Sequence, residues 1–75
     1  MFYQVDVKTK GDYTISYSRV VHIELKKTEI TLYISSSYTK LNDKSIMETY
    51  PLRILEKFIV KEEPKSNYMW WKANG

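Results

Sequence analysis

The sequence predicts a small all-β domain, an antiparallel meander curled into a partly open SH3-like barrel. Apolar and polar residues alternate through the first half of the chain, which is the period of strands with one buried face. Two turns, one around Gly11 and one over residues 26–29, place the apolar residues of the adjoining strands on one shared face. With 75 residues, the chain is long enough for one small core only. The competing prediction is an α+β fold, an antiparallel sheet plus one helix at 51–61.

The first predicted hairpin turns over residues 9–11. Gly11 takes the left-handed position of a type I turn followed by a bulge, because glycine adopts positive φ without steric cost. Lys8 and Asp12 then face each other with opposite charges, which favours the pairing. This register gives three apolar pairs on one face: Val7 with Tyr13, Val5 with Ile15 and Tyr3 with Tyr17.

The second strand is expected to run from Tyr13 towards Lys26, which is long against the usual range of about 3–10 residues. Arg19 falls on the inward phase, so we expect an interruption between Ser18 and Arg19 at which the sheet bends. The following turn lacks glycine and asparagine, and a four-residue loop over 26–29 avoids positive φ. Its register gives three pairs: Leu25 with Ile30, Ile23 with Leu32 and Val21 with Ile34.

The rest of the chain predicts two more strands. After a strand over 30–35 and a loop over 38–45, residues 46–50 form a short strand before Pro51. Residues 51–55 form a single helical turn, and a last strand runs through Phe58 and Val60. In the competing prediction, 51–61 is one helix with Leu52, Leu55, Phe58 and Ile59 on a single face. Residues 1–64 are the predicted domain and 65–75 an aromatic C-terminal tail, for which packing on the domain is one alternative.

The two registers assign twelve residues to the core and leave the opposite face polar. The predicted core is Tyr3, Val5, Val7, Tyr13, Ile15, Tyr17, Val21, Ile23, Leu25, Ile30, Leu32 and Ile34. The opposite face carries Thr14, Ser16, Ser18, His22, Thr31, Tyr33 and Ser35. A flat polar face of this kind, short of charge and bearing tyrosine, suits recognition.

The amino-acid composition argues against catalysis and against metal or cofactor binding. Without cysteine the chain has no disulfide and no thiolate metal site, and a single histidine is a poor start for zinc. The only glycines, Gly11 and Gly75, exclude a glycine-rich phosphate loop. Nothing places a serine and an aspartate beside His22, so we expect no enzyme, no cofactor and no metal.

The start of the chain resembles no targeting segment, and no apolar run reaches the roughly 20 residues that span a bilayer, so a cytoplasmic protein is expected.

Two patches remain for recognition. One is the outer face around His22 and Tyr33, and the other is the tail with Tyr68, Met69, Trp70 and Trp71. Tryptophan and tyrosine dominate the energetics of protein interfaces, so the sequence predicts a non-enzymatic protein-binding module, with self-association also open. Abundant lysine, isoleucine and tyrosine with one alanine indicate AT-rich coding, which suits a small regulator or inhibitor of phage or low-GC bacterial origin.

The alternative function is binding of single-stranded nucleic acid. Small five-stranded barrels bind single strands by stacking bases on exposed aromatic side chains beside lysines. Against this, the net charge of +3 rests almost wholly on lysines interleaved with glutamates, and arginine is scarce. The residues that this alternative would use are Tyr33, Tyr38, Tyr68, Trp70 and Trp71, with Lys40, Lys44, Lys65 and Lys72.

Overall fold

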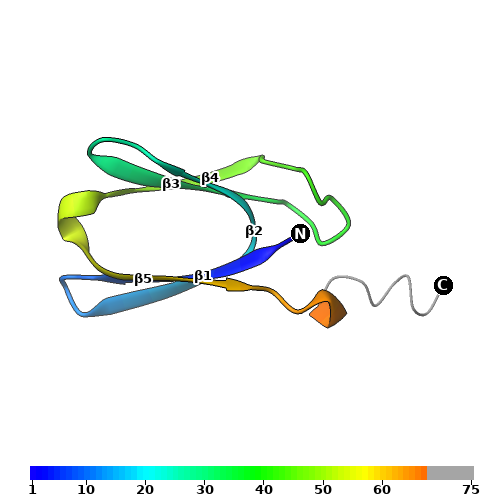
Figure 1. The fold of residues 1–75 in the computed structure, drawn as a ribbon, viewed down its shortest axis with the longest axis horizontal. Coiled ribbons are helices and arrows are strands. Elements are labelled where there is room, and N and C mark those ends of the chain that lie inside the picture. The colour runs from blue at the N-terminus through cyan, green and yellow to red at the C-terminus, as the bar shows by residue number, and fades with distance from the viewer. Residues whose placement is uncertain (68–75) are drawn as a thin grey trace.

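A computed structural model describes residues 1–67 of the chain. Its strands form one antiparallel sheet in the order β4-β3-β2-β1-β5. Figure 1 shows this sheet as two layers, β3 with β4 and β1 with β5, and β2 passes from one layer into the other. The elements are β1 (Tyr3–Thr9), β2 (Tyr13–Leu25), β3 (Glu29–Ile34), β4 (Ile46–Pro51), the 3-10 turn η1 (Leu52–Ile54), β5 (Leu55–Glu62) and the 3-10 turn η2 (Lys65–Asn67).

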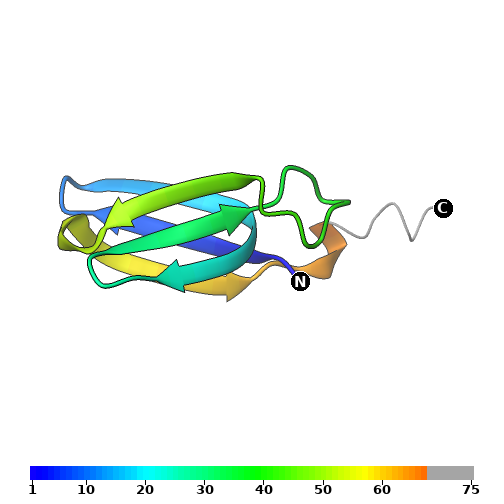
Figure 2. The same ribbon diagram turned by 90° about the horizontal axis from the view of Figure 1, so that it is seen from above.

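The predicted all-β class is confirmed, and the sheet is not closed into a barrel. The edge strands β4 and β5 are joined by η1 but do not pair with each other. Seen from above, the strands of the two layers cross one another (Figure 2). The competing helix over 51–61 is wrong: only the single turn η1 is helical there, and the β-branched residues that follow it pair with β1 as a strand.

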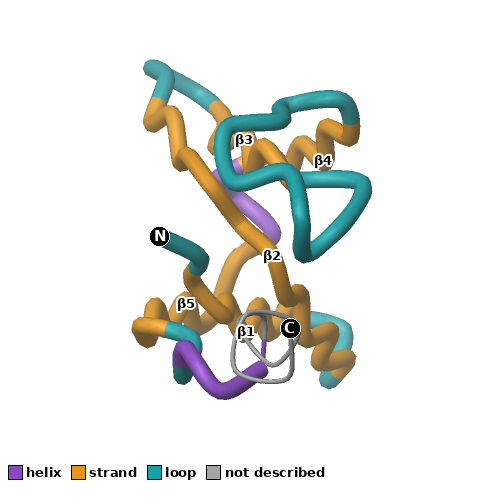
Figure 3. The backbone as a smooth tube through the Cα atoms, turned by 90° about the vertical axis from the view of Figure 1, so that its right-hand side faces the viewer, coloured by secondary structure: helices purple, strands orange, loops and turns teal. Residues whose placement is uncertain are grey.

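A bulge at Arg19 allows one long strand to serve both layers. Arg19 has φ 59, in the left-handed region, so the interruption expected between Ser18 and Arg19 is confirmed. Figure 3 shows β2 running diagonally between the layers. The predicted pair of Val21 with Ile34 is wrong, because the register of β2 against β3 shifts by one residue between Val20 and His22. Val20 pairs with Ile34 instead and is fully buried.

In the first hairpin, the predicted apolar residues still face inward, but they pair with different partners from those predicted. Its loop is 10–12, one residue later than expected, and Asp12, not Gly11, has positive φ at 61. Aspartate tolerates this conformation because its short side chain bonds locally. Each predicted pair therefore shifts by two or three residues, which keeps the inward face: Val7 pairs with Ile15, Val5 with Tyr17 and Tyr3 with Val20.

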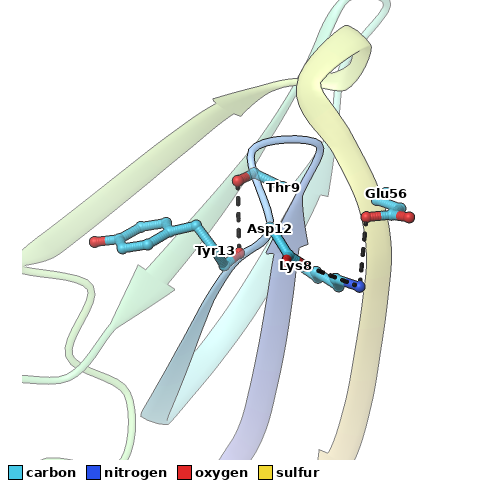
Figure 4. A network of polar contacts seen from close by, with 5 residues as sticks. All are labelled: Lys8, Thr9, Asp12, Tyr13 and Glu56. Carbon is cyan, nitrogen blue, oxygen red and sulfur yellow. Dashed lines mark hydrogen bonds and ion pairs between the residues drawn. The ribbon is translucent and has the colours of Figure 1, made fainter.

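Polar contacts close this turn (Figure 4). The backbone N–H of Asp12 donates to the carbonyl oxygen of Thr9 over 3.1 Å. Lys8 pairs with Thr14 across the strands and not with Asp12 as predicted, but its Nζ still lies 3.6 Å from Oδ1 of Asp12. Lys8 also lies 3.6 Å from Oε2 of Glu56 on β5, so one lysine ties the hairpin to the neighbouring strand.

The second hairpin follows its prediction over most of its length. The N–H of Lys26 donates to the carbonyl of Glu29 over 2.8 Å and closes the turn, which is one residue shorter than the predicted loop because Glu29 already belongs to β3. Leu25 pairs with Ile30 and Ile23 with Leu32, as the sequence indicates. No residue of this turn has positive φ, so the turn forms without glycine.

The core lies between the layers and is smaller than predicted. Its fully or nearly buried apolar residues are Phe2, Val5, Val7, Val20, Ile30, Leu32 and Ile34. Tyr13 and Leu25 were expected there but are 59% and 71% exposed, because each lies at an end of β2 where the opposite layer no longer covers it. Phe2 was not expected and packs edge-on against Tyr38, with ring centroids 5.7 Å apart.

A polar junction holds the bend of β2. The N–H of Arg19 donates to Oε1 of Glu63 over 3.2 Å, and its Nε donates to the carbonyl of Ser35 over 3.0 Å. The guanidinium carbon lies 5.2 Å from the centre of the Tyr38 ring, a cation–π contact. Glu63 is 1% exposed, so the carboxylate that accepts this bond is buried. The bend therefore depends on residues from the β3–β4 loop and from the segment after β5.

Candidate functional site

The side chains with chemical reactivity are dispersed over the fold. Asp6 accepts a hydrogen bond from Ser16 and Asp12 pairs with Lys8, while Asp43 accepts bonds in its own loop. The neighbour of the exposed His22 ring is the Tyr33 ring, which is neither a nucleophile–base pair nor a metal site. Within residues 1–67, no group of three or more potential ligands gathers to hold a metal ion. No helix in the same range is long and apolar enough to cross a membrane.

The outer face of β2, β3 and β4 carries a cross-strand row of three side chains. His22 pairs with Tyr33, and Tyr33 pairs with Met47, so the three stand side by side on one surface. The His22 and Tyr33 rings are 5.5 Å apart between centroids, tilted by 39°. Met47 is 56% exposed. We call these three residues the outer row; a soft thioether beside two rings adapts well to apolar partners.

Lysine and threonine flank the outer row. Nζ of Lys44 lies 5.7 Å from the centre of the Tyr33 ring, within the range of a cation–π contact. One step along the sheet, the hydroxyls of Thr31 and Thr49 share a hydrogen bond of 3.1 Å. Thr31 is fully buried although it belongs to this face, and it lies between its pair partners Glu24 and Thr49. The surface thus combines aromatic and apolar contact area with one cation.

On the inner face of the sheet, Tyr50 of β4 forms a pair with Tyr17 of β2. The hydroxyls of Tyr17 and Tyr50 are hydrogen-bonded, and their rings meet edge-on at 6.3 Å. Burial, then the bond to Tyr50, then the nearby carboxylate of Glu48 raise the pKa of Tyr17. Glu48 itself is exposed and makes no ion pair within the described part of the chain. We call Tyr17, Tyr50 and Glu48 the inner row.

Strand β4 ends the sheet, and its far edge is unpaired in residues 1–67. The N–H of Leu52 donates to the carbonyl of Thr28, which makes those two a hydrogen-bonded pair in the same register as β3 and β4. In an antiparallel ladder such pairs alternate with non-bonded ones. The backbone groups of Tyr50 and Glu48 therefore point to β3, and those of Met47 and Thr49 point to the free edge.

A hollow of about 430 Å³ lies beside η1, where β4 leads into β5. It is lined by Thr28, Glu29, Pro51, Leu52 and Arg53. Glu29 is its one carboxylate and lies 3.7 Å from Nζ of Lys26 in an ion pair. The hollow therefore does not pair a nucleophile with a free base.

Of the predicted site residues, the structure brings His22 and Tyr33 together as expected. The other four, Tyr68, Met69, Trp70 and Trp71, lie outside the described residues. Met47 was missed, and so was the exposure of Tyr13. Lys44 was named only for the nucleic-acid alternative, and the structure places it over the Tyr33 ring. Pairing the strand 46–50 against 30–35 in the sequence is the step that would have placed Met47 beside Tyr33.

Comparison with known proteins gives no relative: no protein-family model, no curated protein and no solved structure matches the chain.

Proposed function

We propose that this protein is a non-enzymatic protein-binding module and that it binds its partner through the outer row. The observation that carries the proposal is the register that places His22, Tyr33 and Met47 side by side on an exposed face. Aromatic and methionine side chains are enriched in interface cores, and Lys44 adds a charged rim beside them. A role as a small regulator or inhibitor is consistent with such a module.

Peptide selection tests this proposal. Peptides selected on the purified protein from a random phage-displayed library are synthesised, and their Kd values are measured by fluorescence anisotropy. We expect Tyr33→Ala and Met47→Ala each to weaken binding at least about tenfold, the effect of losing one interface anchor. Ile59→Ala is the matched control, since Ile59 is an exposed apolar residue of the other edge strand, β5.

Two results would contradict the proposal. One is a library that yields no peptide above background, and the other is equal Kd values for wild type, Tyr33→Ala and Met47→Ala. The nucleic-acid alternative is checked with a single-stranded oligonucleotide. Binding that is strong at about 50 mM salt and falls steeply by about 200 mM would replace the proposed function with that alternative.

A further inference from the structure

We propose that the partner binds as an extended segment that adds a strand to the free edge of β4, with apolar side chains over the outer row and basic side chains over the inner row. This inference rests on the proposed function and names the binding mode and the chemistry of the partner. Addition of a strand takes its affinity from main-chain hydrogen bonds and its specificity from alternate side chains.

The free edge offers main-chain groups at a defined spacing. Met47 and Thr49 point their N–H and carbonyl groups away from β3, and Pro51 ends the edge because it has no N–H to donate. Two residues of the partner can therefore pair with two residues of β4. The side chains of the added strand then alternate between the two faces of the sheet, as those of β4 do.

The two edge strands, β4 and β5, differ in how far charged side chains shield their unpaired edges. Unpaired edges are ordinarily shielded by charged side chains, lysine above all. β5 carries Glu56, Lys57, Lys61 and Glu62, whereas β4 carries Glu48 as its single charge. Ile46 and Met47 are exposed on β4 as well. β4 is thus the edge that is left open to pairing.

The charge of Glu48 indicates which side chains of the partner strand can face the inner row. Glu48 and Tyr50 stand two residues apart on the same face of β4, where the Tyr50 ring meets Tyr17 edge-on. No lysine or arginine of the described residues pairs with Glu48. Tyrosine rings attract cations through their electron-rich faces. A lysine or arginine of the partner at this position meets both a carboxylate and aromatic rings, whereas an acidic residue meets a like charge.

The same carboxylate argues against a second copy of this chain as the occupant. A symmetric antiparallel pair over residues 46–50, in which Met47 of one copy pairs with Thr49 of the other, places Glu48 opposite Glu48. Like charges directly opposite each other destabilise a strand pair.

The test uses three synthetic peptides of about nine residues, each probing one part of the inference. The first alternates valine with lysine, the second alternates valine with glutamate, and the third is the lysine peptide with N-methyl groups on alternate residues. We expect the first to bind and to shift the backbone amide signals of Met47 and Thr49 in NMR spectra. The second and third should bind at least about tenfold more weakly, and Glu48→Gln should reduce the preference of lysine over glutamate.

A matched pair of variants isolates the edge N–H. Thr49→Pro and Thr49→Val both lose the hydroxyl bond to Thr31, but only Thr49→Pro loses the N–H that points to the free edge. We expect Thr49→Pro to weaken the lysine peptide at least about tenfold relative to Thr49→Val. If Thr49→Pro does not fold, the N-methylated peptide on the wild-type protein makes the same comparison.

Equal binding of these two variants, equal binding of the N-methylated peptide, or dimerisation through β4 in light scattering would overturn the inference. The proposed function fails separately. If Tyr33→Ala and Met47→Ala weaken library-selected peptides while Thr49→Pro does not, the outer row binds proteins without strand addition.

Discussion

The backbone N–H of Arg19 donates a hydrogen bond to Oε1 of Glu63, 3.2 Å away and 44 residues later in the chain. Arg19 has φ 59, a conformation that costs an L-residue roughly 1–2 kcal/mol. The bond satisfies an amide that the bulge removes from the β ladder. It also fixes the segment after β5 against the bend at which β2 changes layer. This relationship yields the first two predictions.

Loss of the Glu63 acceptor destabilises the fold. We expect Glu63→Ala to lower the free energy of unfolding by about 1–3 kcal/mol, because it leaves the Arg19 N–H buried without a partner. Glu63→Gln keeps an acceptor oxygen and should cost less. Urea denaturation measures both, with Glu62→Ala as the exposed control at about 0.5 kcal/mol or less. Equal stabilities for Glu63→Ala and Glu62→Ala would show that the carboxylate does not support the bend.

Backbone strain at Arg19 is separable from the contacts of its side chain. Arg19→Ala and Arg19→Gly both lose the bond to Ser35 and the contact with the Tyr38 ring. Glycine, however, adopts positive φ without a steric cost, so Arg19→Gly should be the more stable of the two by about 1 kcal/mol. Thermal unfolding of the two variants checks this. The reverse order would mean that the bulge relaxes to negative φ when the side chain is removed.

The inverted phase of β2 predicts different costs at two adjacent valines. Val20 is fully buried and Val21 is partly exposed. Val20→Ala should lower the free energy of unfolding by about 2 kcal/mol, from lost apolar burial plus a cavity, and Val21→Ala by about half as much. Chemical denaturation of both proteins measures the difference. A larger loss at Val21 would restore the register that the sequence alone predicts.

The raised pKa of Tyr17 predicts a loss of stability in alkali. Burial first, and the bond to Tyr50 second, favour the protonated phenol in the folded state. Since the folded pKa lies above the ordinary value of 10.0, this contribution is complete below pH 10.0 and is lost as the pH rises above it. Denaturation at several alkaline pH values should show a steeper decline for wild type than for Tyr17→Phe. Parallel declines would contradict the assignment.

The hydrogen bonds around Asp43 predict that its pKa lies well below the usual range of a carboxyl group. Hydrogen bonds from the Ser36 side chain, then from its backbone N–H, then from Ser45, lower the pKa of Asp43 to about 2. These bonds support the loop above pH 3.8 and are lost as the pH falls towards 2. An NMR titration should place the pKa of Asp43 closer to 3.8 in Ser36→Ala than in wild type. The Ser45→Ala control should move it less, and an unchanged pKa in Ser36→Ala would contradict this cause.

Local patterns account for most of the fold. The two-residue period predicted the strands. Pro51, together with the β-type run of residues 58–60, favoured one helical turn and a last strand over a helix. The long second strand with an arginine on its inward phase located the bend. Each of these signals lies within about ten residues of the structure that it predicts. Register errors, in contrast, came from a single residue in a turn or a bulge, which changes every pair beyond it.

The candidate site was predictable only in part. His22 and Tyr33 follow from one hairpin and were foreseen. Met47 joins them only through the pairing of β3 with β4 across an eleven-residue connection, from Ser35 to Ser45, whose length does not specify a register. Tyr13 was assigned to the core, because a period shows which face a residue takes but not where the covering layer ends.

By itself, the sequence determined which residues form strands, where the chain turns and where β2 bends, since those properties depend on neighbours in the chain. Only the tertiary structure decided that Val20 is buried, that Glu63 holds the bulge at Arg19, and that β4 is a free edge with a distinct row of side chains on each face. The physical reason is the separation of the contacting groups. Their contacts join segments far apart in the sequence, and the energy that fixes them, burial and hydrogen bonding between layers, has no signature in the spacing of adjacent residues.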